Sequence, residues 1–206
     1  MTPITCFKAY DIRGELLTQL NEKVAYRVGR AFAENLNAKT VVVGSDARKT
    51  SLPLKLALSA GIIDGGAKVF DIGAAGTEEI YFATKHLGVD GGIEVTASHN
   101  PIDYNGMKLV KNDSKPVSGD TGLFAIRDLA ETYSVGEVRT RLEFYSNGLV
   151  SEQAFIQGQA SVEVNKLAVT GHYNELDNMQ PYVAHMLSYI DIANITPIKL
   201  VVNAGN

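Results

Sequence analysis

The sequence contains a single cysteine and no excess of basic residues. Cys6 cannot form a disulfide within the chain, which is compatible with a reducing compartment. The formal net charge of −4 offers no basic field for nucleic acid, so any anionic ligand must be held by a local cluster of cations. No apolar run approaches a membrane span, and residues 1–20 lack the apolar core of a signal peptide. These absences predict a cytoplasmic protein with neither nucleic acid nor a membrane as a partner.

Two kinds of apolar segment alternate along much of the chain. The 206 residues, 45% of them hydrophobic and 20% charged, suffice for one large globular domain or one and a half ordinary ones. Periodic patterns predict helices at about 22–36, 51–63, 77–87 and 123–131, and β-branched runs predict strands at 40–43, 68–72 and 93–96. The repeated order of strand, helix and strand is typical of an α/β layer with parallel pairing.

A polar loop follows the strand at 93–96. Asn100-Pro101 ends this strand, because proline disfavours helical geometry in the residue before it and cannot donate to a ladder. Ser98 therefore lies just past a strand end, where its hydroxyl can face a cleft. Asn105-Gly106 predicts a turn, and the next four residues predict a returning strand that makes the sheet mixed. That return would bring Lys108 back beside Ser98.

A strand-end serine beside His99 and Lys108 permits two interpretations. Residues of these types before a proline also form ordinary polar turns, and neither the G-x-S-x-G elbow nor a Walker loop is present in the sequence. In parallel sheets, however, ligands gather beyond the carboxyl ends of the strands. The loop after the strand at 40–43 ends at the same edge, so Arg48 and Lys49 can approach the cleft. For both residues the sequence favours a solvated loop face.

The N-terminal segment 7–14 adds a second group of polar residues. Its simplest interpretation is a surface turn with an exposed Asp–Arg pair, which contributes little to stability. Alternatively, Arg13 presents a planar guanidinium fork suited to a phosphate, and Tyr10 presents a hydroxyl group.

The run Thr96-Ala97-Ser98-His99-Asn100-Pro101, followed by Asn105-Gly106-Met107-Lys108, resembles the phosphoserine loop of the α-D-phosphohexomutases, in their phosphomannomutase/phosphoglucomutase branch. The segment 7–14 is similar to that family's N-terminal active-site segment. The resemblance covers about 5–133 and 180–206 and is weak between them. It implies a three-layer α/β domain at 1–133, with a mixed, mostly parallel sheet between helices. A connector at 134–178 and the start of a second, similar domain at 179–206 would follow.

The resemblance implies an intramolecular phosphotransferase that carries its phosphoryl group on Ser98. This group would convert a hexose monophosphate, the expected partner, into a 1,6-bisphosphate, which also serves as activator. The sugar would then turn over and return its other phosphate to the serine. Lys108 matches a cation near the transferring group, and His99 an acid–base or orienting residue. The positions that match phosphate-binding residues are Tyr10, Arg13 and Asn100.

The expected reaction interconverts mannose 6-phosphate and mannose 1-phosphate and feeds GDP-mannose and surface polysaccharide synthesis. A phosphoglucomutase or a bifunctional mutase is the alternative. The sugar-recognition loop of the family is absent from the sequence, so the choice of hexose stays open. Mannose is favoured because the segments 10–14 and 91–96 look closest to bacterial phosphomannomutases. The oligomeric state is not indicated.

One departure from the family concerns its Mg²⁺ ion. The family holds this ion with the serine phosphate, here on Ser98, and with three aspartates of an Asp-Gly-Asp-x-Asp-Arg loop. Only Asp64-Gly65 and Asp90-Gly91 occur in the sequence, and neither continues the motif. A phosphate oxygen alone supplies too few ligands for a hard octahedral ion. The sequence therefore predicts either an N-terminal fragment of a working mutase, itself inactive, or a noncatalytic remnant that keeps only the phosphate-binding loop.

The C-terminal third has a weaker rhythm. Residues 134–175 mix charges, glycine and asparagine with short apolar runs, which predicts a connector with some strand character. A buried-type strand is expected at 198–203, after a helix at about 181–193. The residues of that helix expected to face inward are Val183, Met186, Leu187 and Ile190. The histidines expected at the surface or without a suggested partner are His86, His172 and His185.

Overall fold

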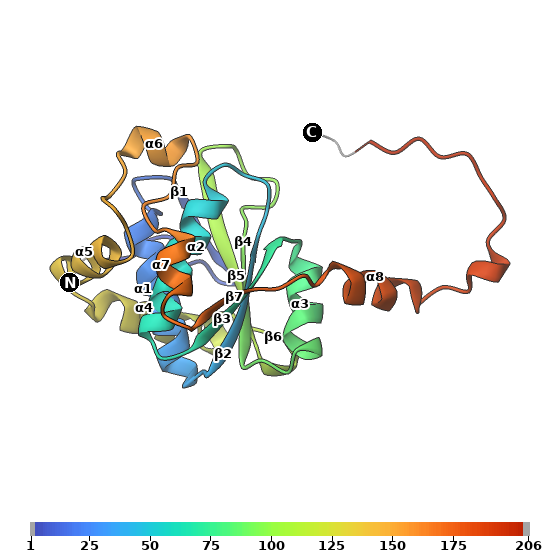
Figure 1. The fold of residues 1–206 in the computed structure, drawn as a ribbon, viewed down its shortest axis with the longest axis horizontal. Coiled ribbons are helices and arrows are strands. Elements are labelled where there is room, and N and C mark those ends of the chain that lie inside the picture. The colour runs from blue at the N-terminus through green and yellow to red at the C-terminus, as the bar shows by residue number, and fades with distance from the viewer. Residues whose placement is uncertain (1–2, 204–206) are drawn as a thin grey trace.

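The structure is a computed structural model that describes residues 3–203 of the chain. Within that range one seven-stranded sheet has the order β1-β5-β4-β2-β3-β7, with β6 paired to β5 (Figure 1). The strands are β1 Ile12–Glu15, β2 Thr40–Ser45, β3 Lys68–Ala74, β4 Gly91–Val95, β5 Tyr104–Lys111, β6 Lys115–Pro116 and β7 Tyr173–Glu175. The α-helices are α1 Glu22–Leu36, α2 Ser51–Asp64, α3 Thr77–His86, α4 Leu123–Thr132, α5 Val135–Phe144, α6 Glu152–Ile156, α7 Val164–Ala168 and α8 Met179–Leu187.

The directions of the strands make the sheet mixed. β2 pairs in parallel with β3 and β4, and β3 pairs in parallel with β7, as the order of strands and helices predicts. β5 runs antiparallel to its partners β1, β4 and β6. Every strand of the described range except β5 therefore runs one way, which confirms the predicted mixed, mostly parallel sheet.

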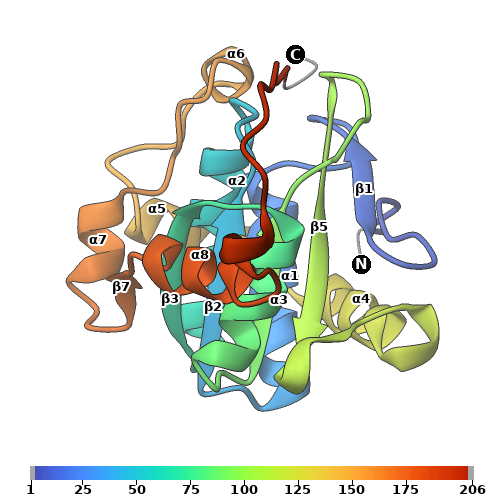
Figure 2. The same ribbon diagram turned by 90° about the vertical axis from the view of Figure 1, so that its right-hand side faces the viewer.

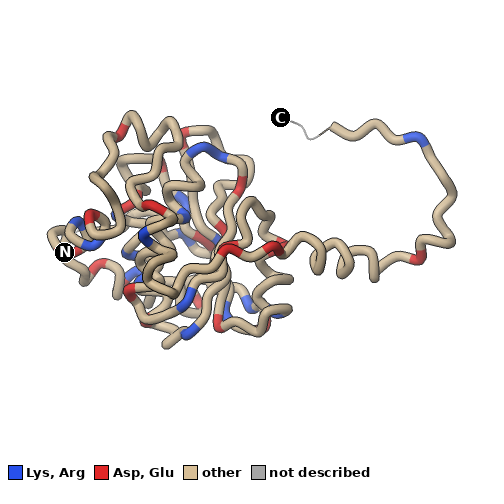
Figure 3. Tube along the Cα trace, in the orientation of Figure 1, with Lys and Arg blue, Asp and Glu red and all other residues tan. Residues whose placement is uncertain are grey.

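Helices cover both faces of this sheet. α1, α2 and α4 lie on one face, and α3 lies on the other (Figures 1 and 2). A large core that includes Phe32, Leu58 and Ile93 fills the first interface, and a smaller one around Val42 and Ile80 fills the second. The three-layer α/β architecture is thus confirmed. Acidic and basic residues are interspersed along the chain (Figure 3), and no helix within residues 3–203 is both long and apolar enough to cross a bilayer.

Local sequence signals set the ends of α1 and its contact with α2. Asn21 caps α1 by accepting a hydrogen bond from a first-turn N–H at 3.1 Å, and Asn37 ends the helix in the left-handed region. Gly29 and Gly61 let the two helix backbones meet, since a Cβ on Gly61 would lie 2.0 Å from the Tyr26 carbonyl oxygen. A side chain at either glycine would push the helices apart.

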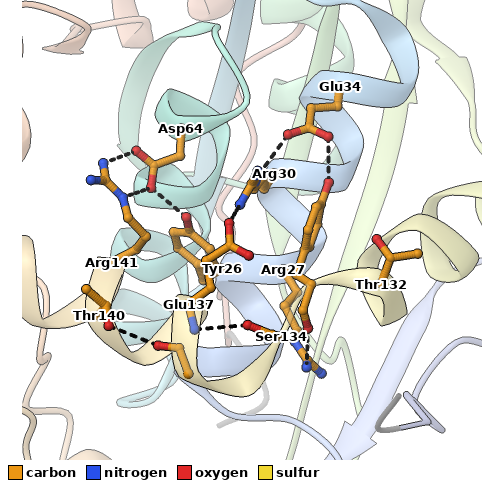
Figure 4. A network of polar contacts seen from close by, with 12 residues as sticks. Tyr26, Arg27, Arg30, Glu34, Asp64, Thr132, Ser134, Glu137, Thr140 and Arg141 are labelled. Atoms are coloured by element: carbon orange, nitrogen blue, oxygen red, sulfur yellow. Dashed lines mark hydrogen bonds and ion pairs between the residues drawn. The ribbon is translucent and has the colours of Figure 1, made fainter.

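Residues 134–178, expected to form a connector with some strand character, instead form three helices and one strand. α5 is tied to the rest of the chain through Asp64 at the end of α2. The Asp64 carboxylate accepts hydrogen bonds from the Tyr26 hydroxyl and the Arg141 guanidinium (Figure 4). It also accepts one from the Tyr145 hydroxyl. This cluster fixes α5 against α1 and α2.

The strand β7 extends the sheet beyond β3. Its Tyr173 is buried, and the Tyr173 hydroxyl donates to Asp71, which also forms a buried ion pair of 2.7 Å with Lys55. Earlier in the segment 134–178, the Ser161 hydroxyl and N–H both donate to the Glu22 carboxylate. Each of these contacts joins residues that are not neighbours in sequence, so no local sequence pattern predicted them. The division into domains at 133 and 178 stays a prediction.

The C-terminal segment departs from its prediction. α8 ends at Leu187, and the four side chains expected to face inward are each 43–49% exposed. No strand forms at 198–203, where Val201 is 100% exposed. Figure 1 shows the chain beyond α8 leading away from the body of the structure, so no described element covers its apolar residues. Residues 204–206, the end of the predicted second-domain start, lie outside the described residues.

Two histidines have an aromatic partner that the sequence did not suggest. The rings of His86 and His185 both stack on Phe82, with centroid distances of 4.9 Å and 4.7 Å. This contact links α8 to α3. His172 is exposed, as predicted.

Candidate active site

The loop after β4 holds its serine in an uncommon backbone conformation. Ser98 has a φ of 54°, in the left-handed region that residues other than glycine rarely adopt. Two hydrogen bonds fix this turn: the Ser98 N–H donates to Thr96 Oγ1 at 2.9 Å, and the Asn100 N–H donates to the Ala97 carbonyl at 3.0 Å. The side chains of Ser98 and His99 are left exposed, with Ser98 Oγ 3.3 Å from His99 Nδ1. A hydroxyl beside an imidazole is therefore open to a ligand.

Arg48 holds the main chain of this loop. Its Nη1 donates to the carbonyls of Pro101 at 2.7 Å and Tyr104 at 3.2 Å. Its Nη2 donates to the carbonyls of Ser98 at 3.1 Å and Asn100 at 2.5 Å. The prediction of a solvated loop face for Arg48 is wrong, because the loops after the adjacent parallel strands β2 and β4 meet at one edge of the sheet.

Asp46 joins the same loop to the start of α2. Its Oδ2 accepts from the Thr96 hydroxyl at 2.8 Å, and its Oδ1 accepts from the Ser51 hydroxyl at 2.5 Å. The carboxylate also lies 3.6 Å from Arg48 Nε. The loop after β2, the first turn of α2 and the serine loop thus form one connected polar unit.

The dipeptide Asn105-Gly106, expected to form a turn, lies inside β5. Asn105 is buried, and its Nδ2 donates to the Ser51 hydroxyl at 2.9 Å. Gly106 faces Arg13 of β1, and a Cβ on this glycine would lie 2.2 Å from the Ile12 carbonyl oxygen. The glycine is therefore required by the close approach of β1 and forms no turn, while β5 returns antiparallel to β4 as predicted.

Strand β1 brings a second group of charges to the loop. Arg13 Nη1 donates to Asn100 Oδ1 at 2.5 Å, and Arg13 Nη2 donates to Asp11 Oδ2 at 2.8 Å. On the neighbouring β5, Lys108 Nζ lies 3.6 Å from the same Asp11 oxygen. Arg13 Nε is buried and has no hydrogen-bond partner within residues 3–203. Arg13 and Lys108, two of the predicted site residues, thus share Asp11, and Arg13 joins this pair to a third, Asn100.

A cleft of ≈ 720 Å³ opens over the serine loop. Its lining residues are Asp46, Ala47, Arg48, Thr96, Ser98, His99, Asn100 and Ile102. Tyr10 is not drawn into this network, since its side chain is 80% exposed and its hydroxyl has no hydrogen-bond partner among the described residues. Its phosphate-binding role stays a prediction. Lys49 is exposed, as the sequence predicted.

Comparison with known proteins shows the family to which this chain belongs. The sequence profile of the phosphoglucomutase/phosphomannomutase alpha/beta/alpha domain I matches residues 5–135. The chain belongs to the phosphoglucomutase/phosphomannomutase family. The match spans the strands β1 to β5, which carry the serine loop and its two arginines.

Relatives in the phosphoglucomutase/phosphomannomutase family show how much of a family member this chain represents. A phosphomannomutase of Salmonella typhimurium (strain LT2) is 52% identical over 206 residues, which are 100% of this chain and 39% of the relative. A phosphomannomutase of Klebsiella pneumoniae is 66% identical over 131 residues, 64% of this chain and 83% of the relative. The crystal structure of a candidate phosphomannomutase from Thermus thermophilus has a TM-score of 0.68 and 25% identity, covering 94% of this chain and 38% of that chain. The chain thus spans about 39% of the length of the Salmonella relative.

No sequence pattern pointed to Glu94, a buried residue of this phosphoglucomutase/phosphomannomutase domain. It lies on β4, is 1% exposed, and neither of its carboxylate oxygens has a hydrogen-bond partner within residues 3–203. Burial and the nearby charge of Asp46 raise the pKa of Glu94 to about 9, although Lys55 acts in the opposite direction. Glu94 is therefore protonated at neutral pH and adds no negative charge at the strand end. The one feature of the sequence that could have drawn attention to Glu94 is the presence of an acid within an apolar strand.

The magnesium ion that the family resemblance implies does not fit the described residues. Within residues 3–203, no three His, Cys, Asp or Glu side chains lie close enough to share a metal ion. A hard octahedral ion requires several oxygen ligands from the protein, the substrate or water. The phosphate chemistry assigned to this part of the phosphoglucomutase/phosphomannomutase chain therefore depends on the side chains that the chain itself supplies.

Proposed function

We propose that this chain carries the phosphoserine of a phosphomannomutase, which interconverts mannose 6-phosphate and mannose 1-phosphate. The observation that carries the proposal is the Ser98 loop, in which an exposed hydroxyl lies beside His99 in a left-handed turn whose backbone carbonyls are bound by Arg48. Family membership and a phosphomannomutase relative at 52% identity support it. Serine accepts a phosphoryl group poorly unless neighbours neutralise the developing charge, and Arg13 and Lys108 are the cations assigned to that role.

In the proposed reaction, a hexose 1,6-bisphosphate first phosphorylates Ser98. The bond between Ser98 Oγ and phosphorus forms, and the bond between phosphorus and the sugar oxygen breaks. The serine proton passes through His99, whose Nδ1 is 3.3 Å from Oγ, to the leaving sugar oxygen. The reverse step on a hexose monophosphate gives the bisphosphate again. The sugar then turns over and returns its other phosphoryl group, so the net change is an isomerisation.

The phosphorylated serine would change the partners of the nearby cations. A serine phosphate carries a charge of about −1.5 to −2 near neutral pH. Arg13 and Lys108 share the single carboxylate of Asp11, and Arg13 Nε has no partner within the described range. We assign Arg13, Lys108 and the Asn100 amide to the incoming phosphate, with Asp11 as the group that holds the cations beforehand. Tyr10 completes the proposed phosphate-binding set.

Mannose is the proposed sugar because the relatives bear the name phosphomannomutase. A phosphoglucomutase, or an enzyme that accepts both sugars, is the alternative, since the family description includes both activities. We place the reaction in the cytoplasm, in the supply of mannose 1-phosphate for GDP-mannose, a location with which the free cysteine Cys6 is compatible. A noncatalytic phosphate-binding remnant is a second candidate, favoured by the missing carboxylate cluster within residues 3–203.

A chimera tests these alternatives. This chain would replace the matching residues of the Salmonella typhimurium phosphomannomutase, and conversion of mannose and glucose phosphates would be measured. We expect mannose phosphate turnover that is lost in Ser98→Ala and kept in Ser188→Ala, an exposed serine on the C-terminal segment. A folded chimera that binds phosphate without turnover would support the remnant. The isolated chain is expected to show no turnover with Mg²⁺ and bisphosphate, and measurable conversion would contradict that expectation.

A further inference from the structure

We propose that Arg48 is a positioning residue that fixes the backbone of the serine loop and so presents the Ser98 hydroxyl in one orientation. The inference rests on the proposed function and deepens it, because it assigns a part of the machinery that never touches the phosphate. It follows from the contacts of one guanidinium group with four carbonyl oxygens.

The guanidinium of Arg48 ties the outgoing arm of the loop to its returning arm. Nη2 binds the carbonyls of Ser98 and Asn100, next to the reactive hydroxyl. Nη1 binds the carbonyls of Pro101 and Tyr104, where the chain enters β5. A planar group with donors at fixed angles is suited to hold several acceptors in one arrangement, which an ammonium group cannot do.

Arg48 is itself anchored to the ends of two strands. Its N–H donates to Asp46 Oδ1 at 3.0 Å, and its Nε lies 3.6 Å from Asp46 Oδ2. The Asp46 N–H in turn donates to the carbonyl of Val95, the last residue of β4, at 3.0 Å. β2 and β4 are buried parallel neighbours, so the strand ends that anchor Arg48 are rigid. The loop that Arg48 holds is, in contrast, exposed.

The donors of Arg48 are already occupied, which argues against a role in gripping a substrate. A guanidinium has five N–H donors. In Arg48, Nη1 and Nη2 each serve two carbonyls and Nε faces Asp46, while the side chain is only 14% exposed. Arg13 differs, since its Nε has no hydrogen-bond partner within residues 3–203. Arg48 therefore acts through the loop, and its loss should affect the reaction rate more than the binding of substrate.

The backbone of Ser98 explains why such a holder is needed. A φ of 54° is unfavourable for serine, so the loop keeps this conformation only while surrounding contacts impose it. Without Arg48, four carbonyls lose a donor and Ser98 is free to relax toward extended backbone. The hydroxyl would then leave the position next to His99.

Amide hydrogen exchange, measured by NMR on the 206-residue chain, tests the positioning without any substrate. In Arg48→Ala, the amides of Ser98 and Asn100 should exchange about tenfold faster or more, while the amides of β2 and β4 keep their rates. Arg48→Lys should give an intermediate increase, because it keeps the charge and loses the fork. Lys49→Ala, an exposed neighbour, should change nothing. Unchanged exchange at Ser98 and Asn100, or an equal increase throughout β2 and β4, would overturn the proposal.

The chimera with the Salmonella relative connects positioning to chemistry. Arg48→Ala should lower kcat about 100-fold and change KM by less than about threefold. Guanidinium ion, added below denaturing concentrations, should restore part of this loss in Arg48→Ala and none of the loss in Ser98→Ala. A raised KM with normal kcat would overturn the proposal by making Arg48 a substrate ligand. An inactive unsubstituted chimera would sink the proposed function, and the exchange rates would then decide by themselves whether Arg48 holds the loop.

Discussion

Replacing Glu94 with glutamine should stabilise the chain at neutral pH. The carboxyl is 1% exposed, has no hydrogen-bond partner within residues 3–203, and has a pKa raised from 4.5 to about 9. The folded chain therefore keeps a proton that the unfolded chain releases. The stability that Glu94 contributes is complete below pH 4.5 and is lost progressively as the pH rises toward 9.

The size of the effect follows from the pH interval. Between pH 4.5 and pH 7 lie roughly 2.5 pH units, and at about 1.36 kcal/mol per unit they correspond to about 3 kcal/mol of unfolding free energy. Glutamine has nearly the same shape and binds no proton in this range. Glu94→Gln should therefore gain about 2–3 kcal/mol at neutral pH and almost nothing at pH 4.5.

Urea unfolding followed by circular dichroism, at several pH values between about 4.5 and 8, measures this difference. Glu152→Gln, which changes an exposed carboxylate of α6, is the matched control and should show no gain that grows with pH. A gain for Glu94→Gln that is independent of pH, or a loss of stability at neutral pH, would refute the reasoning. The Glu94 carboxylate would then be ionised in the folded chain and satisfied by a partner.

Three further predictions concern the site and its support. Ser98 should be the only serine of the chimera that stably carries phosphate after incubation with a hexose 1,6-bisphosphate, and peptide mapping that finds label on Ser45 or Ser51 instead would contradict this. Lys108→Ala should lower chimera turnover about 100-fold and change the unfolding free energy by less than about 1 kcal/mol, because its 3.6 Å pair with Asp11 is partly exposed; parallel losses in both would make Lys108 structural. Asp64→Asn should cost about 1–3 kcal/mol in urea unfolding at neutral pH, whereas Asp128→Asn, on an exposed pair, should cost less than about 0.5 kcal/mol. Burial by itself would raise the Asp64 pKa, but the hydrogen bonds from Arg141, Tyr26 and Tyr145 outweigh burial and lower this pKa. The cost of Asp64→Asn should therefore shrink as the pH falls below 3.8. A cost that does not change with pH would argue against the assignment.

Much of the first 133 residues was predictable because the signals there are local. The continuous apolar run at 40–43 is stable only when both faces are covered, and it forms the central strand β2. The N-terminal cap of α1 is Asn21, as its position before the periodic residues predicted. The serine loop could be placed because Asn100-Pro101 marks the end of a strand with Ser98 beyond it, whereas its role followed only from the family resemblance.

Strand order decided the rest of the site. Arg48 is 52 residues from Asn100 in sequence, and Arg13 is 87 residues from it, yet both hold the same loop. They meet there because β2 lies beside β4 and β1 lies beside β5, an arrangement that no single segment encodes. The same neighbours bury Glu94 and leave it protonated. Tyr10, in contrast, is exposed and has no hydrogen bond to the described residues, so its role stays a prediction.

The C-terminal third shows the same division most clearly. The helices and strand within 134–178 are short, and they are held by contacts such as those of Asp64 and Asp71 with residues 77–102 positions away. The sequence determined the apolar pattern of α8 and of 198–203, but a pattern predicts burial only when another element lies across it. Within the described chain α8 meets α3 at Phe82, and no element lies across 198–203, so those apolar side chains stay half or fully exposed. Local chemistry therefore determined which segments become helices and strands, and tertiary contact alone decided which of their faces are covered.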